Sequence, residues 1–308
     1  MTESTNKQPM ITAVIPAYNE ERTIGWIVEE TRKHVDQVIV VDDGSTDGTG
    51  GIAVSAGATV LKHPQKAGYG AALATGFNYV RNNGAGILVV LDADGQHDPG
   101  QIPQLVKPII SGKADIVTGS RFIQDGLKRQ VPVYRRFGIG VVNKAWKFAS
   151  SDSLTDTQCG FRAYSRRAIE GIDITEAGMS ASLEVLDQAS DKNLKVVEVP
   201  VSVRYGADTS TMRPGKHGME LINYIIKKLK EEHPLLIFGG GGMLLTVIGL
   251  GFGILALNSY FETRYLPYGP TLIAGVTIYV GTLMIFGGLI LNAIQSVAAK
   301  LEEKRPRK

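Results

Sequence analysis

The chain has 308 residues, of which 44% are hydrophobic and 20% are charged, and its formal net charge is +3. This length can hold two domains, and the composition fits a globular protein with a membrane portion. So small a net charge gives no reason to expect nucleic acid as a partner. The single cysteine, Cys159, excludes an internal disulfide and fits a reducing compartment. Because the first ten residues are polar, we expect no signal peptide and a cytoplasmic amino-terminal domain.

Short apolar runs alternate with segments of helical periodicity over the first 118 residues. The runs predict strands at residues 11–15, 38–41, 59–61, 87–91 and 116–118. Helices are expected at 68–82, at 102–110 and after Asn19, which can cap the first one. This alternation predicts an α/β fold with a mostly parallel, doubly wound sheet.

The pattern loosens after the fifth strand and then resumes. A basic loop, an amphipathic segment, a helix and a last strand are expected at 128–136, 137–148, 180–191 and 196–204. Pro200 favours an edge position for that strand. We expect the soluble domain to comprise residues 1–215.

Acidic residues follow the apolar run 87–91, in the stretch LDADGQHDP. Asp92, Asp94 and Gln96 alternate at period two, so on an extended backbone they face the same way. Their oxygens suit one Mg²⁺ or Mn²⁺ ion, which would complete its shell with water and a diphosphate. The stretch therefore predicts a nucleotide substrate. The alternative is a polar loop that only ends a strand.

The last third of the chain predicts a membrane anchor. Residues 216–233 form a basic amphipathic helix that suits a membrane surface. Within residues 234–299, the stretches 235–257 and 272–294 carry no charge and are each long enough to span a bilayer; two buried core helices are the alternative. A basic tail, residues 300–308, ends the chain.

Basic residues before the first span and after the second place both termini in the cytoplasm by the positive-inside rule. The loop between the spans would lie outside. Gly249 and Gly253 form a GxxxG pattern on the first span, which suits a helix contact either within the hairpin or between subunits of a homo-oligomer.

Four further stretches accompany the acidic motif. They are ITAVIPAYNEE at 11–21, VIVVDDGSTDGT at 38–49, HPQKAGYGAALATGF at 63–77, and SRF at 120–122 with DTQCGFRAYS at 156–165. In this order the chain resembles the family 2 glycosyltransferases, and more narrowly the polyisoprenyl-phosphate glycosyltransferases of the dolichyl-phosphate mannose synthase type. The resemblance covers about residues 10–215. It implies the nucleotide-sugar-binding glycosyltransferase type A fold, followed here by the interfacial helix and the two-helix hairpin.

The resemblance also implies roles for individual residues. The nucleotide-sugar pocket would be lined by Pro16, Tyr18, Glu20, Asp42, Asp43, Lys66 and Asp92. The catalytic set would be Asp94, Arg121, Asp156 and Glu184, with Asp156 and Glu184 near the sugar to orient its hydroxyls or the arginines. Glu20 and Asp43 have the alternative of being only cap and turn residues. Lys66 departs from the family, whose members commonly carry Asn there.

A phosphomonoester acceptor is already mostly a dianion at neutral pH, so it needs no general base. Such a site should show cations instead. The candidates for acceptor phosphate binding are Arg121, Arg135, Arg136, Arg204 and Lys216. Surface charge is the alternative for each of them. Lys216 ends a loop that is longer than the family's usual one.

The sequence thus predicts inverting transfer of one hexose from a nucleotide sugar to dolichyl or polyprenyl phosphate. UDP-glucose or UDP-N-acetylglucosamine is favoured over GDP-mannose, because a two-span hairpin resembles UDP-dependent members. One alternative is a processive polysaccharide synthase, but neither Trp26 nor Trp146 lies in the QxxRW motif of that class. The other is an inactive membrane scaffold, against which the intact acidic motif argues.

Overall fold

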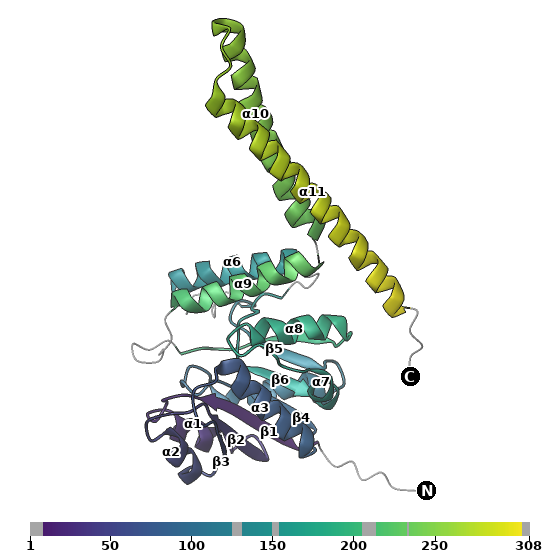
Figure 1. Cartoon of the computed structure of the whole chain (residues 1–308). Helices are drawn as coiled ribbons and strands as arrows, with labels where there is room; N and C mark the ends of the chain where they lie inside the picture. The colour runs from purple at the N-terminus through teal and green to yellow at the C-terminus, as the bar shows by residue number, and fades with distance from the viewer. Residues whose placement is uncertain (1–8, 125–130, 150–153, 205–213, 233, 304–308) are drawn as a thin grey trace. The chain divides into compact units, whose positions relative to one another are not determined.

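The computed structural model describes residues 9–124, 131–149, 154–204, 214–232 and 234–303 (Figure 1). The chain forms two compact units, Met1–Tyr224 and Ile225–Lys308. The boundary lies inside a helix, nine residues beyond the predicted domain end at residue 215. We describe each unit by itself.

The amino-terminal unit is built on one sheet, which has seven strands within the described residues. They are β1 (Ile11–Ala17), β2 (Gln37–Asp42), β3 (Thr59–Lys62), β4 (Ile87–Val90), β5 (Ile116–Ser120), β6 (Arg162–Ser165) and β7 (Val196–Pro200). Their order is β3-β2-β1-β4-β6-β5-β7, and β6 runs antiparallel to both of its neighbours while the other pairs are parallel. The prediction of a mostly parallel sheet is confirmed.

Helices cover both faces of the sheet, as a doubly wound fold requires. They are α1 (Ile24–Thr31), α2 (Thr49–Ser55), α3 (Tyr69–Asn82), α4 (Ile102–Ile110), α6 (Val133–Ala149), α7 (Arg166–Gly171) and α8 (Ala181–Asp191). One buried apolar cluster packs α1, α2 and α4 against the sheet, and a second packs α3, α7 and α8. The core therefore lies in two layers on either side of the strands.

The antiparallel strand β6 was not predicted. Its direction brings the residues that precede it to the edge where β4 and β5 end, because Arg162 pairs with both Val90 and Thr118. The motif at 156–161 therefore lies at the same edge as the acidic motif after β4.

Three local predictions were wrong. Asn19 does not cap α1, because that helix begins only at Ile24. The backbone of Asn19 has a φ of 55°, and its side chain accepts a hydrogen bond from the Thr46 backbone N–H instead. The basic loop ends earlier than expected, because Pro132 lies directly before the helix α6, at a position where its missing N–H costs nothing. The last strand stops at Pro200, after which Val203 makes an isolated bridge to His97.

The carboxy-terminal part is helical. The helix α9 (Pro214–Glu232) crosses the unit boundary, and a π-helical turn (Leu235–Gly239), α10 (Gly240–Thr263) and α11 (Tyr268–Glu303) follow. Residues Leu235–Thr263 and Tyr268–Val297 are long and apolar enough to cross a membrane, and only 11% and 17% of their most apolar windows are buried. They are not buried core helices, and such exposed apolar surface indicates membrane association.

Glycines let the two helices of the hairpin approach closely. A Cβ on Gly242 would come within 2.4 Å of the Gly281 carbonyl oxygen, and one on Gly249 within 2.5 Å of Thr277 Oγ1. Gly249, in the predicted GxxxG pattern, therefore contacts α11 inside the hairpin, as does Gly253 more loosely beside Ala274.

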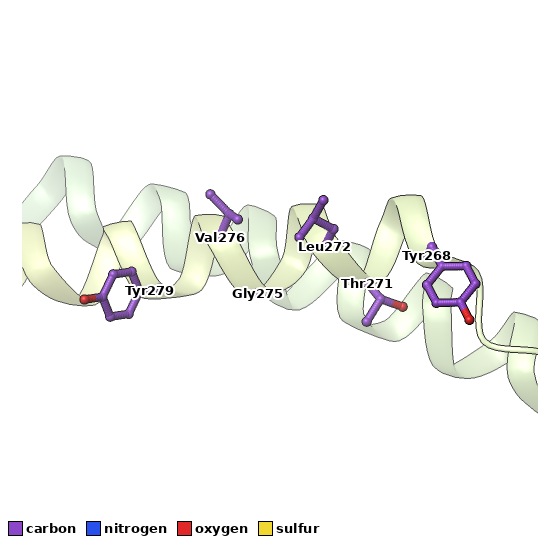
Figure 2. Close-up of a pocket in the computed structure, with 6 residues that line it drawn as sticks. All are labelled: Tyr268, Thr271, Leu272, Gly275, Val276 and Tyr279. Atoms are coloured by element: carbon purple, nitrogen blue, oxygen red, sulfur yellow. The ribbon is translucent and has the colours of Figure 1, made fainter.

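Elsewhere on α11, one face carries a shallow apolar groove lined by Tyr268, Thr271, Leu272, Gly275, Val276 and Tyr279 (Figure 2).

Candidate active site

Two carboxylates meet just after β4. Asp94 Oδ1 accepts a hydrogen bond from the Gln96 backbone N–H at 3.0 Å. Burial, and next the negative charge of Asp92, raise the pKa of Asp94 to about 7, with a smaller contribution from Glu20. Asp94 therefore lies close enough to Asp92 and Glu20 for their charges to disfavour its ionised form.

This arrangement fits a divalent cation, because a buried carboxylate beside a like charge is stabilised by a metal ion. Within the described residues, no group of three His, Cys, Asp or Glu side chains surrounds such a site. Mg²⁺ commonly binds through one or two carboxylates and takes its other ligands from water and substrate phosphates. Asp92 and Asp94 suit this mode, with the amide of Gln96, which is 8% exposed, in the same turn.

His97, which we did not include among the predicted site residues, lies next to Asp92. Its Nε2 is 3.6 Å from Asp92 Oδ2, and its ring packs on Phe161 with the centroids 5.2 Å apart. The backbone N–H of Arg204 donates to the Gln96 carbonyl at 2.9 Å. The acidic loop is thus joined to the chain after β7 through the backbone of Arg204, a residue that is exposed.

Gly160 is a second residue that the sequence reading missed. A Cβ at this position would lie 2.6 Å from Asp92 Oδ2 and 2.8 Å from Oδ1. The motif before β6 therefore passes directly against the carboxylate of Asp92, and only glycine leaves that carboxylate its place. The neighbouring sequence gives no sign of this contact, because Asp92 lies 68 residues earlier in the chain.

Asp42 has one carboxylate oxygen without a hydrogen bond. Its Oδ1 accepts from the Ser45 backbone N–H at 2.8 Å, whereas the buried Oδ2 has only the Lys62 ammonium at 3.6 Å. A Cβ on Gly50 would approach Oδ2 to 2.8 Å, so the glycine leaves room beside it. Pro16, also predicted for this pocket, pairs with Val41 next to it in the sheet.

Asp43 has a different environment. Its carboxylate accepts three hydrogen bonds of 2.8 Å, from the backbone N–H groups of Ala67 and Gly68 and from His63 Nδ1. On its other side, His63 Nε2 lies 2.9 Å from Thr75 Oγ1. The alternative reading of Asp43, as a residue that fixes a turn, is supported by this geometry.

The turn fixed by Asp43 carries Lys66 to Tyr18. The ammonium lies 3.5 Å from the centre of the Tyr18 ring, a cation–π contact. Two residues predicted for the nucleotide-sugar pocket are therefore neighbours, although 48 residues separate them in the chain. Glu20, two residues after Tyr18, donates its backbone N–H to Thr49 Oγ1 at 2.8 Å.

Arg121 and Asp156 form a two-point ion pair. Arg121 donates from Nε to Oδ2 at 2.6 Å and from Nη2 to Oδ1 at 2.8 Å, and its backbone N–H reaches Oδ2 at 3.2 Å. Asp156 is fully buried and the arginine side chain is 11% exposed. Such a fork fixes the plane of the guanidinium. The predicted role of Asp156 as a residue that orients an arginine agrees with this contact.

Glu184 is buried and holds a loop. Its carboxylate accepts the backbone N–H groups of Thr175 at 3.1 and 3.0 Å and of Glu176 at 3.0 Å, and the Thr175 hydroxyl also donates to it. Ala177, next in that loop, accepts the Gly70 N–H at the start of α3. These contacts give Glu184 a structural task, and its predicted place near the sugar stays a prediction.

The remaining predicted cations lie on helices. Arg135 and Arg136 belong to the first turn of α6 and Lys216 to the first turn of α9. Arg136 is half-buried, whereas the side chains of Arg135 and Lys216 lie outside the described part of the chain. Farther along α6, Asn143 accepts from Thr157 Oγ1 at 2.7 Å, which joins this helix to the motif before β6.

The glycosyl transferase family 2 model matches residues 12–172, which include β2 to β6 and all of β1 but its first residue. The chain belongs to this family and is a glycosyltransferase. Its fold is the glycosyltransferase type A fold, as the resemblance implied.

Two relatives narrow the comparison. The polyprenol monophosphomannose synthase of Mycolicibacterium smegmatis is 34% identical over 200 residues, which are 61% of this chain and 75% of the relative. The UDP-N-acetylglucosamine–dolichyl-phosphate N-acetylglucosaminyltransferase of Methanococcus voltae is 31% identical over 216 residues, 64% of this chain and 86% of the relative. The chain is similar to enzymes of the polyisoprenyl-phosphate type that differ in the sugar named.

Among solved structures, the chain is similar to glucosyl-3-phosphoglycerate synthase from Mycobacterium tuberculosis, crystallised with Mn²⁺, UDP-glucose and phosphoglyceric acid. The two share 23% identity with a TM-score of 0.57, over 71% of this chain and 79% of that one. At this identity the likeness supports the fold alone.

Proposed function

We propose that the protein transfers one hexose from a nucleotide sugar to the phosphate of a polyprenyl lipid at a membrane. The observation that carries the proposal is the Arg121–Asp156 pair, a fixed guanidinium at the sheet edge that also carries Asp92 and Asp94. The names of the two relatives, which state polyprenol or dolichyl phosphate, support the same acceptor. The exposed apolar hairpin supports a reaction at the membrane.

Two groups of residues would balance the negative charges of the acceptor phosphate and of the leaving diphosphate. A phosphate dianion is itself the nucleophile, so what the protein must supply is a cation that holds it. Arg121 takes that part, because the buried carboxylate of Asp156 fixes the direction of its N–H groups. A divalent cation held by Asp92 and Asp94 would act as a Lewis acid toward the leaving diphosphate.

We further propose a uridine diphosphate sugar as the donor. Asp42 offers one buried carboxylate oxygen without a hydrogen bond, while its other oxygen is engaged by Ser45. Uracil presents a single imide N–H, whereas guanine presents two adjacent N–H donors that suit a carboxylate with both oxygens open. Asp43 is engaged in another task, because its carboxylate accepts three hydrogen bonds from the stretch at residues 63–68. The similarity to the UDP-N-acetylglucosamine-dependent relative supports this choice, whereas the similarity to the polyprenol monophosphomannose synthase argues against it.

We propose, finally, the topology expected from the sequence: a cytoplasmic catalytic domain, residues 1–215, and a hairpin with both ends on the cytoplasmic side. The lysines of α9 before the first span and the charges after Val297 support it by the positive-inside rule.

The reaction is tested by incubating purified full-length protein with Mn²⁺, polyprenyl phosphate and one radiolabelled donor at a time: UDP-glucose, UDP-N-acetylglucosamine or GDP-mannose. We expect label in the organic phase from a UDP-sugar, carried by a lipid bearing one sugar. Polyprenol, which lacks the phosphate, is the matched control acceptor and should stay unlabelled. Equal labelling of polyprenol would overturn the phosphate acceptor. A product that lengthens with time would identify a processive synthase, and no product with any donor would favour the scaffold.

A further inference from the structure

We propose that Glu198, on the edge strand β7, is a positioning residue for the acceptor phosphate. It acts through the backbone of Thr155 and Asp156, and so through the ion pair that orients Arg121. The inference rests on the proposed function, because it takes Arg121 as the group that binds the acceptor. The sequence reading assigned no role to Glu198.

The carboxylate of Glu198 is the acceptor for two consecutive backbone N–H groups. The N–H of Thr155 lies 2.9 Å from both oxygens, and the N–H of Asp156 lies 2.9 Å from Oε1. The Thr155 hydroxyl lies 3.1 and 3.0 Å from the same two oxygens. Bonds from N–H groups to a carboxylate are stronger than neutral ones, so Glu198 restrains this backbone firmly.

The register of the sheet explains how the carboxylate reaches the loop. Glu198 pairs with Thr118, two residues before Ser120 at the end of β5. Ser120 Oγ lies 2.6 Å from Thr155 Oγ1, which places Thr155 over the end of that strand. The residue after Ser120 is Arg121, so the loop and the arginine leave the same point of the sheet.

The side chain of Asp156 has little freedom to compensate for a displacement of its backbone. Its side chain has two rotatable bonds and is fully buried, and both its oxygens are engaged by Arg121. A displaced Cα therefore displaces the carboxylate, and with it the guanidinium. Such an effect should appear in the use of the acceptor rather than in the binding of the nucleotide, because the residues predicted for the nucleotide, Asp92 excepted, lie in or shortly after β1 and β2 or in the stretch 63–68.

The same loop has independent supports, which keep the test clear of unfolding. Asn143 Nδ2 donates to the Thr155 carbonyl at 2.6 Å, and Arg162 donates to the carbonyls of Thr157 and Cys159 at 2.7 and 2.9 Å. Replacing Glu198 should thus misplace Asp156 without releasing the whole segment.

The experiment measures the KM for polyprenyl phosphate, kcat, and the dissociation constant of UDP with Mn²⁺ in full-length Glu198→Ala, Glu198→Gln and Asp156→Asn proteins. For Glu198→Ala we expect the acceptor KM to rise about tenfold, the lower end of the loss seen when the hydrogen-bond partner that orients a metal ligand is removed. UDP binding should change less than about twofold. Glu170→Ala is the matched control, because Glu170 is 56% exposed and contacts only Arg166 on its own helix in the described contacts.

Two readouts separate positioning from loss of fold. Glu198→Gln keeps an oxygen for the contacts now made by Oε1 and should recover most of the acceptor KM. In an Asp156→Asn background, Glu198→Ala should add less than about twofold, because the ion pair it serves is already weakened. Hydrogen exchange of the Thr155 and Asp156 amides should be faster in Glu198→Ala and unchanged in Glu170→Ala.

The outcomes are distinguishable. If the wild-type protein labels polyprenyl phosphate and Glu198→Ala has an unchanged acceptor KM, the inference is wrong and the proposed function stands. Equal, additive losses in the wild-type and Asp156→Asn backgrounds would also overturn it. If the wild-type protein makes no lipid product with any donor, the proposed function fails first, and the acceptor role of Glu198 fails with it.

Discussion

Replacing Gly160 by alanine tests whether the motif before β6 sets the position of Asp92. The new Cβ would lie 2.6 Å from Asp92 Oδ2, whereas ordinary contacts begin at 3.4 Å. The carboxylate must therefore move by about 0.8 Å. A displacement of about 1 Å in a catalytic arrangement costs about a hundredfold in rate. Asp92 is 33% exposed, so it can turn toward solvent and the fold should survive.

The assay is transfer of label from the preferred donor to polyprenyl phosphate, with the dissociation constant of Mn²⁺ and the Tm measured on the same preparations. We expect turnover to fall about a hundredfold, Mn²⁺ binding to weaken and the Tm to change little. Gly51→Ala is the matched control, since a Cβ at Gly51 meets nothing within 4 Å. Wild-type turnover and Mn²⁺ affinity in Gly160→Ala would refute the link between this motif and the metal carboxylates.

Three further predictions follow from the site and the hairpin. Asp94→Asn, or EDTA added to the wild-type protein, should lower turnover about a hundredfold or more, and full activity in EDTA would exclude the metal. Because burial and Asp92 raise the pKa of Asp94 from 3.8 to about 7, the metal-free fold should lose stability as the pH rises through that window. The Tm in EDTA should show this loss in the wild-type protein and not in Asp94→Asn. Cysteines placed at Ser55 and Ser259 in a Cys159→Ser background should react from opposite sides of sealed vesicles, and labelling from one side would contradict a spanning hairpin.

The sequence predicted the central parallel strands well, because β1, β2, β4 and β5 contain short apolar runs and are buried along most of their length. The edge strands β3 and β7 are only partly buried. The strand β6 was missed because Arg162 stands at its start. In the fold this arginine is only 3% exposed, and its guanidinium donates to the carbonyls of Thr157, Cys159 and Ser182. Three carbonyls converging on one side chain leave no local pattern in the sequence.

The same reason explains what was found and missed in the site. Asp92 and Asp94 could be recognised because their spacing is local and their strand is apolar. Gly160 and Glu198 could not, since their importance comes from contacts with residues 68 and 42 or more positions away. Asn19 was misread for a related cause: its partner is the turn at Ser45 and Thr46, and not the helix that follows it.

The antiparallel strand also divides the sheet into two blocks. On one side of the pairing between β4 and β6, the strands β1 to β4 come from one continuous stretch, residues 11–90; on the other side, β5 to β7 come from residues 116–200. The residues proposed for the nucleotide lie in or next to the first block. The three connected residues Arg121, Asp156 and Glu198 lie in the second. We therefore expect recombination at the connection between α4 and β5 to exchange acceptor preference between relatives while the donor stays the same.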